Sequence, residues 1–210
     1  MSGISIIGLG NMAGALADRA LAGGNAVEII GRDPAKAKEL AATLGGATAG
    51  TAGAAPAGDI VILAVPYGSA AAVVSEYGDA LRGKVIIDIT NPVNADFTGL
   101  VSPEGSSGAQ EIAKAAPAGA HVVKAFNTLF SHVLAAGPAE GRPLDVFIAG
   151  DDARAKARVS AFIESLGLRP LDTGMLPMAR ALENVGLLQL GLLTHSVKHT
   201  NFFVGVTILS

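Results

Sequence analysis

The chain contains no cysteine. This absence excludes disulfide bonds, cysteine nucleophiles and thiolate metal sites. Tryptophan is also absent, and aromatic residues make up only 4% of the 210 residues. A buried core must therefore consist mainly of Ala, Val, Ile and Leu, the composition typical of continuous buried parallel strands.

Charge of either sign is sparse, with 15 basic and 18 acidic residues and a formal net charge of −3. No basic excess of the kind that nucleic-acid binding requires is present, so we expect no nucleic-acid partner. The apolar runs are shorter than a membrane span, and no basic stretch followed by a long apolar segment begins the chain. We therefore expect a cytoplasmic protein with no membrane partner.

Glycine is abundant, and its most informative occurrence is the segment GLGNMAG at residues 8–14. This segment follows an apolar run at 4–7 and precedes a helix-like stretch at 15–21, the order of a phosphate-binding corner. Gly8 permits the tight turn, Gly10 lets the backbone approach a pyrophosphate, and Ala13 is small enough for the helix to pack on the strand. A pyrophosphate would then bind the free N–H groups at the start of the helix.

The end of the second predicted strand, residues 27–30, bears on which dinucleotide binds. NAD enzymes usually carry an acidic residue there, but this chain has Gly31 followed by Arg32, with Lys36 one helical turn later. A guanidinium suits a 2′-phosphate, so the pattern favours NADP(H). Two alternatives remain: Asp33 could face the ribose and reverse the preference, or Arg32 and Lys36 could be solvated surface charges.

Strand-like and helix-like segments alternate along the chain. We expect strands at 4–7, 27–30, within 47–53, and at 59–65, 84–89, 121–125, 144–149, 169–172 and 201–209, and helices at 15–21, 34–44, 69–81, 109–116, shortly after 127, 152–166 and 179–194. This alternation predicts an α/β fold, a doubly wound parallel sheet of the Rossmann type. We expect one dinucleotide-binding domain over 1–210, with 175–210 as a C-terminal helix and strand extension.

Ligands of such sheets bind beyond the carboxyl ends of the strands. We therefore expect the loops that begin at Gly8, Gly31, Val65, Thr90 and Ala125 to converge on one crevice. The loop at 93–107 is long enough to suggest a functional role or disorder. The C-terminal segments from 179 and over 202–209 are apolar, and we expect them to cover the crevice or to form the interface of a homodimer.

Several segments together resemble a known family. They are IGLGNM at 7–12, AVP at 64–66, IDITNP at 87–92, VKAFNT at 123–128, AGDD at 149–152 and ARALE at 179–183. These segments resemble the deazaflavin-coenzyme:NADP oxidoreductases and, more distantly, the cytosolic reductase domain of mammalian metalloreductases. The resemblance implies hydride transfer between NADP(H) and a small-molecule acceptor, 8-hydroxy-5-deazaflavin or a flavin.

The resemblance also implies roles for individual residues. In this sequence the resemblance assigns the pyrophosphate to Leu9, Gly10, Asn11 and Met12, and the 2′-phosphate to Arg32 and Lys36. It places the rest of the cofactor along Val65, Pro66 and Asn91. The nicotinamide is then expected near Ala125, Phe126 and Asn127. Gly31 stands where the family often has serine. Its presence removes one hydroxyl from the phosphate site.

No catalytic residue is assigned from the sequence. Tyr67 is the only obvious acid in the strand-end loops, but a deazaflavin or flavin ring accepts a hydride and is protonated from solvent, so the protein mainly has to position two rings. Asp88 either stabilises the turn that follows it or belongs to the site. Asp151 and Asp152 are expected to cap a helix.

Two further patterns of charged or metal-ligating residues lie in the C-terminal part of the chain. Arg180 and Glu183 are expected to pair with each other or with a partner chain. His195 and His199 lack a third ligand nearby, so we expect no metal site.

Three other functions remain as alternatives. Pyrroline-5-carboxylate reductases share the Gly-Asn-Met turn but need a longer helical domain. Gly191, Lys198 and Asn201 faintly match a catalytic segment of β-hydroxyacid dehydrogenases. A non-catalytic NADP(H)-binding redox sensor would be favoured if Phe126 or the 93–107 loop filled the acceptor side of the nicotinamide.

Overall fold

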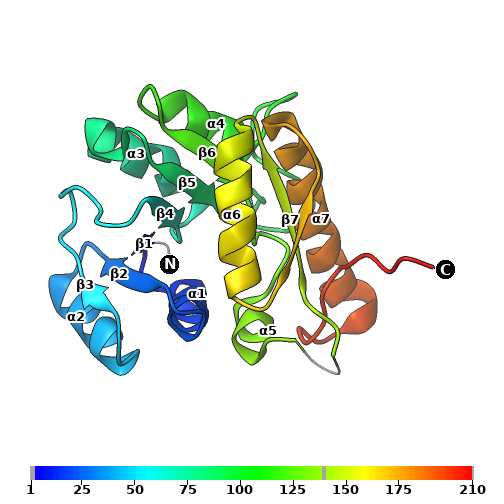
Figure 1. The fold of residues 1–210 in the computed structure, drawn as a ribbon. Helices are drawn as coiled ribbons and strands as arrows, with labels where there is room; N and C mark the ends of the chain where they lie inside the picture. The colour runs from blue at the N-terminus through cyan, green and yellow to red at the C-terminus, as the bar shows by residue number, and fades with distance from the viewer. Residues whose placement is uncertain (1–2, 139–140, 210) are drawn as a thin grey trace.

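The structure, a computed structural model, describes residues 3–138 and 141–209. The other residues, which the expected domain 1–210 includes, lie outside this description. Its strands are β1 (Gly3–Ile7), β2 (Ala26–Ile30), β3 (Thr48–Ala49), β4 (Ile60–Leu63), β5 (Val85–Asp88), β6 (His121–Lys124), β7 (Asp145–Gly150) and β8 (Arg169–Asp172). The α-helices are α1 (Asn11–Ala22), α2 (Pro34–Thr43), α3 (Tyr67–Tyr77), α4 (Gly108–Ala115), α5 (Ser131–Ala136), α6 (Ala153–Ser165) and α7 (Ala179–Leu192) (Figure 1).

The strands form one sheet in the order β3-β2-β1-β4-β5-β6-β7-β8. The chain winds outward in both directions from the neighbouring pair β1 and β4, as expected for a Rossmann-type α/β fold. All pairs are parallel except β6 and β7, which are antiparallel, so the expectation of a wholly parallel sheet is wrong at this place. The six-residue α5 spans only about 9 Å and does not return the chain along the length of the sheet.

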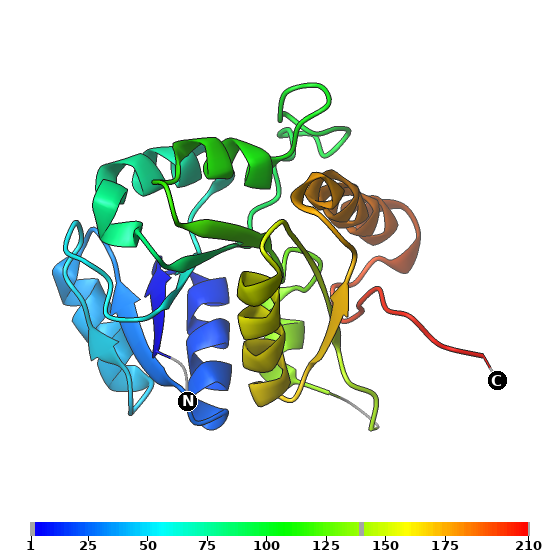
Figure 2. The same cartoon turned by 45° about the horizontal axis from the view of Figure 1, so that its top comes forward.

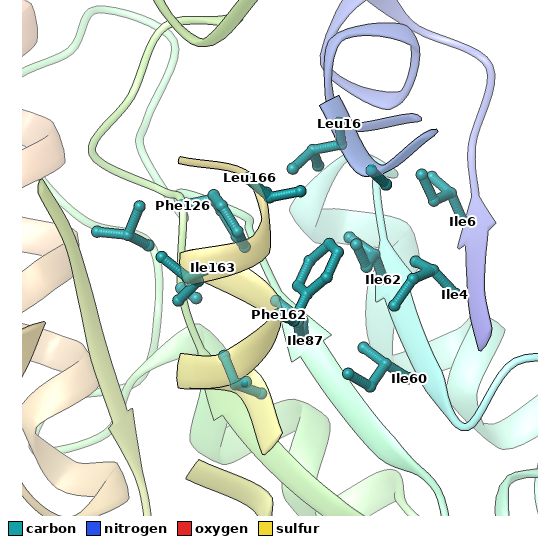
Figure 3. Packing of buried hydrophobic residues seen from close by; sticks show 14 of the residues in the cluster. Ile4, Ile6, Leu16, Ile60, Ile62, Ile87, Phe126, Phe162, Ile163 and Leu166 are labelled. Carbon is teal, nitrogen blue, oxygen red and sulfur yellow. The ribbon is translucent and has the colours of Figure 1, made fainter. Parts of the chain in front are cut away.

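Hydrophobic residues pack on both faces of the sheet because the strands alternate their side chains. Ile60 and Ile62 face the core beneath α1 and α6, whereas Val61 and Leu63 face the core beneath α3 and α4. Phe162 of α6 lies among the isoleucines of the first core (Figure 3). Both layers of helices are visible in Figure 2. None of the described helices is long and apolar enough to cross a membrane.

The C-terminal segment differs from the sequence prediction. After α7 a five-residue π-helical turn, Leu193–Val197, ends the helix, and residues 198–209 have no regular structure. The strand predicted at 201–209 is therefore absent (Figure 1). The reason lies in its partners: the Val206 N–H donates to Asp145 Oδ2 at 2.6 Å and its carbonyl accepts from Arg169 Nη2, so side chains replace a strand ladder.

Candidate functional site

A cleft of about 720 Å³ opens where β1, β2 and β4 end. We call it the strand-end cleft, and it is lined by segments 7–10, 30–33 and 64–66 together with part of α3. β1 and β4 are the strands from which successive helices pass to opposite faces of the sheet, the usual ligand position in this architecture. The volume is within the ordinary range for a small-molecule or cofactor site.

The glycine turn forms one wall of the strand-end cleft. Gly8 has a φ of +141°, and a Cβ added there would lie 2.0 Å from the Ala64 carbonyl oxygen, so no other residue fits without movement. Gly10 meets no atom within 4 Å of such a Cβ and stands at the N-cap of α1, where no side chain caps the helix. The first N–H groups of a helix lack intrahelical acceptors, and no side chain caps those of α1, so a phosphate in the cleft beside Gly10 can bind them.

The other residues of the motif serve α1 in different ways. Ala13 is fully buried, and Met12 is partly buried against the same core, so both fix the helix on the sheet. Asn11 is exposed and lines an adjoining open groove between α1 and α5. Leu9 and Gly10 border both spaces. The predicted pyrophosphate residues thus lie together at one corner of the sheet.

The end of β2 forms the opposite wall. Arg32 and Lys36 are exposed and both line the strand-end cleft. Asp33 caps α2 by accepting hydrogen bonds from the backbone N–H groups of Ala35 and Lys36 at 3.0 and 3.2 Å. This role directs one carboxylate oxygen of Asp33 to the helix, while Arg32 makes no ion pair with any residue in the described ranges.

Gly31 has a structural reason to be glycine. A Cβ at this position would lie 2.4 Å from Leu9 Cδ1, because the Leu9 side chain lies directly across it. The glycine turn and the end of β2 are thus packed against each other. A serine at position 31 would require the Leu9 side chain to move.

The remaining predicted residues divide between two places. Val65 and Pro66 line the strand-end cleft, but Asn91, Ala125, Phe126 and Asn127 do not. The Asn91 amide donates to the Asn127 carbonyl at 2.8 Å, and Asn127 Nδ2 donates to Asn91 Oδ1 at 2.9 Å. The loops after β5 and β6 therefore do not line the strand-end cleft itself, and they bind each other and α7.

Phe126 and Ala125 are buried, so their side chains belong to the core rather than to a ligand surface. Phe126 has a φ of +62° and packs edge-on against Phe162 with ring centroids 6.1 Å apart. A left-handed conformation at a bulky residue is strained and persists where the surroundings fix it. The side chains of Ala125 and Phe126 are therefore not available to a cofactor.

Sequence reasoning missed a set of acidic and basic side chains beneath these loops, which we call the buried charged cluster (Asp88, Lys124 and Glu183). Lys124 Nζ lies 2.9 Å from Asp88 Oδ2 and 2.9 Å from Glu183 Oε1, and it also donates to the Thr90 carbonyl. All three side chains are fully buried, with an exposed fraction of 0%. A lysine and an aspartate at the ends of two otherwise apolar strands, Val85–Asp88 and His121–Lys124, were the signal available in the sequence.

The cluster also decides two open alternatives. Asp88 accepts a hydrogen bond from the Thr90 N–H at 2.8 Å, so it stabilises the turn and belongs to the cluster as well. The expected pair between Arg180 and Glu183 is wrong: Glu183 accepts from the Gly108 and Ala109 N–H groups at the start of α4, and Arg180 binds the Pro103 and Ser106 carbonyls.

Tyr67, the acid noted in the sequence, begins α3 and packs against Gly108. Burial raises the pKa of its phenol, and the nearby carboxylates of Glu111, Glu183 and Asp88 raise it further. The hydroxyl is therefore protonated at neutral pH. Within the described ranges, no group of three His, Cys, Asp or Glu side chains is arranged to hold a metal ion.

The C-terminal segment does not line the strand-end cleft, so the expectation that it covers the crevice is wrong. Residues 202–204 are partly buried, whereas Ile208 and Leu209 are exposed. α7 instead packs its inner row over the loops after β5 and β6: Asn127 Nδ2 donates to the Leu182 carbonyl, and Gln189 Nε2 donates to the Thr128 carbonyl.

Comparison with known proteins gives consistent results. Residues 3–92 match the family described as NADP oxidoreductase coenzyme F420-dependent. An F420-dependent NADP reductase of Methanothermobacter marburgensis is 30% identical over 167 residues, which cover 76% of this chain and 69% of that protein. The chain belongs to the F420-dependent NADP oxidoreductase family. It is thus an NADP-dependent oxidoreductase, and its family cofactor is NADP(H).

Two further relatives extend this result. A solved structure of a candidate F420-dependent NADP reductase from Arthrobacter sp. FB24 superposes with a TM-score of 0.87 at 25% identity, covering 99% of this chain and 100% of that one. Metalloreductase STEAP3 of Rattus norvegicus is 32% identical over 88% of this chain, but the chain spans only 36% of that protein. The metalloreductase likeness is therefore as strong in identity as the likeness to F420-dependent NADP reductases, although the motifs of the sequence resemble the latter more.

Proposed function

We propose that this protein transfers a hydride between NADP(H), bound in the strand-end cleft, and a flavin-like or deazaflavin acceptor. The acceptor is proposed because relatives named F420-dependent NADP reductases match most of the chain. In this proposal the residues assigned from the sequence hold the cofactor: the glycine turn binds the pyrophosphate, and Arg32 and Lys36 bind the 2′-phosphate.

The single observation that carries the proposal is the pairing of two positive surfaces across one cleft. The uncapped N-terminus of α1 faces it from one side, and the exposed Arg32 and Lys36 face it from the other. A dinucleotide with a 2′-phosphate presents its negative groups to both. One carboxylate oxygen of Asp33, the residue that would have favoured NAD(H), caps α2, and the other lies 4.0 Å from Lys36 Nζ.

When bound, NADPH supplies the hydride, and the residues of this chain have only to bind and orient it. The loops of Asn91 and Asn127 lie beyond the pyrophosphate corner along the sheet, in the order β4-β5-β6, and we propose that the nicotinamide lies against them. Tyr67 begins α3 beside Gly108 and keeps its proton at neutral pH. An acceptor ring that is protonated from solvent needs little further assistance.

The test has two steps. Binding of NADPH and NADH is first measured by titration, and we expect NADPH to bind at least about tenfold more tightly, as a charged contact to the 2′-phosphate implies. NADPH oxidation is then followed with deazaflavin, flavin and ferric acceptors. Turnover with deazaflavin or flavin supports the proposal, whereas turnover with ferric chelates alone would replace the acceptor by the metalloreductase type.

A non-catalytic redox sensor is the alternative from another class. Phe126 does not fill the acceptor side, because its side chain is 1% exposed and lies in the core. The 93–107 loop is held by Arg180 and by Asn94, whose side chain accepts from the Thr98 and Gly99 N–H groups. Among the described residues, neither Phe126 nor the 93–107 loop lines the strand-end cleft. Tight NADPH binding without turnover on any acceptor would nevertheless show that the protein is a sensor and not an enzyme.

We also propose that the protein acts as one domain and assembles as a homodimer in the cytoplasm. The support for a dimer is the exposed apolar C-terminal segment, where Ile208 and Leu209 are 84% and 89% exposed. Light scattering on the full chain and on a chain ending at residue 203 tests it. A dimer that becomes a monomer on truncation supports the proposal, and a monomeric full chain contradicts it.

A further inference from the structure

The buried charged cluster carries a net negative charge. Each of the three N–H groups of the Lys124 ammonium has an acceptor, namely Asp88 Oδ2, Glu183 Oε1 and the Thr90 carbonyl. The carboxylates accept in turn from backbone N–H groups, Asp88 from Thr90 and Glu183 from Gly108 and Ala109. An ammonium donates only and a carboxylate accepts only, so this pattern fits one cation and two anions.

The cluster lies next to the loops assigned to the nicotinamide. Asp88 ends β5 and Lys124 ends β6, and the two residues are paired in the register of the sheet. Asn91 and Asn127 each follow by three residues, and three residues of extended chain reach at most about 10 Å. Because the cluster is wholly buried, bulk water does not separate it from these loops.

We propose that the buried charged cluster sets the relative affinity of the protein for oxidised and reduced NADP. The inference rests on the proposed function, because it places the nicotinamide at these loops. When NADPH gives up a hydride, both electrons of the C–H bond pass to the acceptor and the nicotinamide ring gains one positive charge. A net negative cluster nearby stabilises the charged ring of NADP+ and leaves the neutral ring of NADPH nearly unaffected, so it favours hydride donation by NADPH.

The size of the effect follows from Coulomb's law. A unit charge about 10 Å away, at an effective dielectric constant of about 20, changes an affinity by about tenfold. The N-terminus of α4, which Glu183 faces, carries a partial positive charge of about half a unit and offsets part of this effect. We therefore expect a change of about threefold to tenfold when one carboxylate of the cluster is neutralised.

The experiment measures the dissociation constants of NADP+ and NADPH by calorimetry in the absence of any acceptor. Glu183→Gln removes one negative charge from α7, and Asp88→Asn removes one from β5. The two variants change different elements, so an effect common to both reflects the charge. In both variants we expect the ratio of the NADP+ constant to the NADPH constant to rise about threefold to tenfold. Glu164→Gln, an exposed position on α6, removes the same charge at the surface and should leave the ratio unchanged.

Each outcome bears on the inference. A merely structural role predicts that both forms of the cofactor lose affinity equally, and an unchanged ratio in folded Glu183→Gln or Asp88→Asn overturns the inference. Should both variants fail to fold, the wild-type ratio decides: NADP+ binding at least as tightly as NADPH supports the inference, and NADPH binding much more tightly overturns it. If the wild-type protein binds neither form, the proposed function itself has failed.

Discussion

At the scale of the residue, the two glycines of the turn are required for different reasons, Gly8 by the backbone and Gly10 by the ligand. Gly8 is required by the backbone, because its φ of +141° and the nearby Ala64 carbonyl leave no room for a side chain. Gly10 is not required in this way, since a Cβ there would meet nothing within 4 Å. We therefore interpret the lack of a side chain at Gly10 as a requirement of ligand binding, because it lets the pyrophosphate approach the N-terminus of α1.

Alanine substitution should distinguish the two glycines. We expect Gly8→Ala to lower the free energy of unfolding by about 2–4 kcal/mol through strain and overpacking. Gly10→Ala should leave stability nearly unchanged but weaken NADPH binding, because the added methyl keeps the pyrophosphate from the helix N–H groups. Urea unfolding and cofactor titration of both variants measure this. Equal stability losses in the two variants would contradict the assignment.

The second prediction at the scale of the residue concerns Arg32. We expect Arg32→Ala to weaken NADPH binding by about 1.5–3 kcal/mol and NADH binding much less, because only NADPH offers a 2′-phosphate. Lys38→Ala is a matched control, since Lys38 is an exposed cation on α2 outside the lining of the strand-end cleft. Equal losses for the two cofactors in Arg32→Ala would show that this residue does not contact the phosphate.

At the scale of the element, α1 has to be seated on the sheet before its N-terminus can bind an anion. Ala13 is 0% exposed and lies in the core between α1 and the strands. The small side chain sets how closely the first turn of α1 approaches β1. Cofactor binding and helix packing therefore depend on the same residue.

We expect Ala13→Leu to lower the free energy of unfolding by about 1–3 kcal/mol and to abolish tight NADPH binding, because overpacking displaces the first turn of α1. Ala22→Leu places the same side chain at an exposed position of the same helix and should change neither property appreciably. Circular dichroism melts and NADPH titrations provide the comparison. Retention of full binding in Ala13→Leu would mean that the phosphate site lies elsewhere.

The sequence predicted α7 as an element but not the face that it buries. Residues 179–194 have helical composition, and the structure forms α7 at Ala179–Leu192. Its inner row includes Glu183, Gly186 and Gln189, which contact Lys124, Asn91 and the Thr128 carbonyl respectively. Apolar periodicity does not reveal such a row, because a buried polar side chain becomes recognisable only when its partner on another element is known.

At the scale of the whole molecule, an ion pair between β7 and β8 holds the C-terminal segment through hydrogen bonds to the backbone of Val206. Asp145 is 1% exposed and lies 2.5 Å from Arg169 Nε, while its other oxygen accepts from the Val206 N–H. Burial alone would raise the pKa of Asp145, but the hydrogen bonds from Arg169 and Val206 outweigh it and hold the pKa below its usual range. Since the folded pKa is depressed, this contact stabilises the protein above the unfolded value of about 3.9 and the stabilisation is lost as the pH falls below it.

Asp145→Asn should therefore destabilise the protein at neutral pH and release the C-terminal segment to proteolysis. The difference in stability between wild type and variant should shrink as the pH falls below about 4, because the wild-type carboxyl is then protonated as well. Asp96→Asn is a suitable control, since Asp96 lies in the exposed 93–107 loop far from Arg169 in sequence. A difference that persists unchanged at low pH would contradict the role of the ionised carboxylate.

The sequence by itself determined the alternation of strands and helices, the strand-turn-helix corner at Gly8 and Gly10, and the cation at Arg32. These features depend on local conformation and on spacing within one βαβ unit, which neighbouring residues specify. Only the tertiary structure decided that β7 runs antiparallel, that residues 201–209 form no strand, and that Asp33 caps α2. It also brought Asp88, Lys124 and Glu183 together from β5, β6 and α7. The free energy of a buried charge depends on its partners, and those partners lie 36 and 59 residues from Lys124 along the chain.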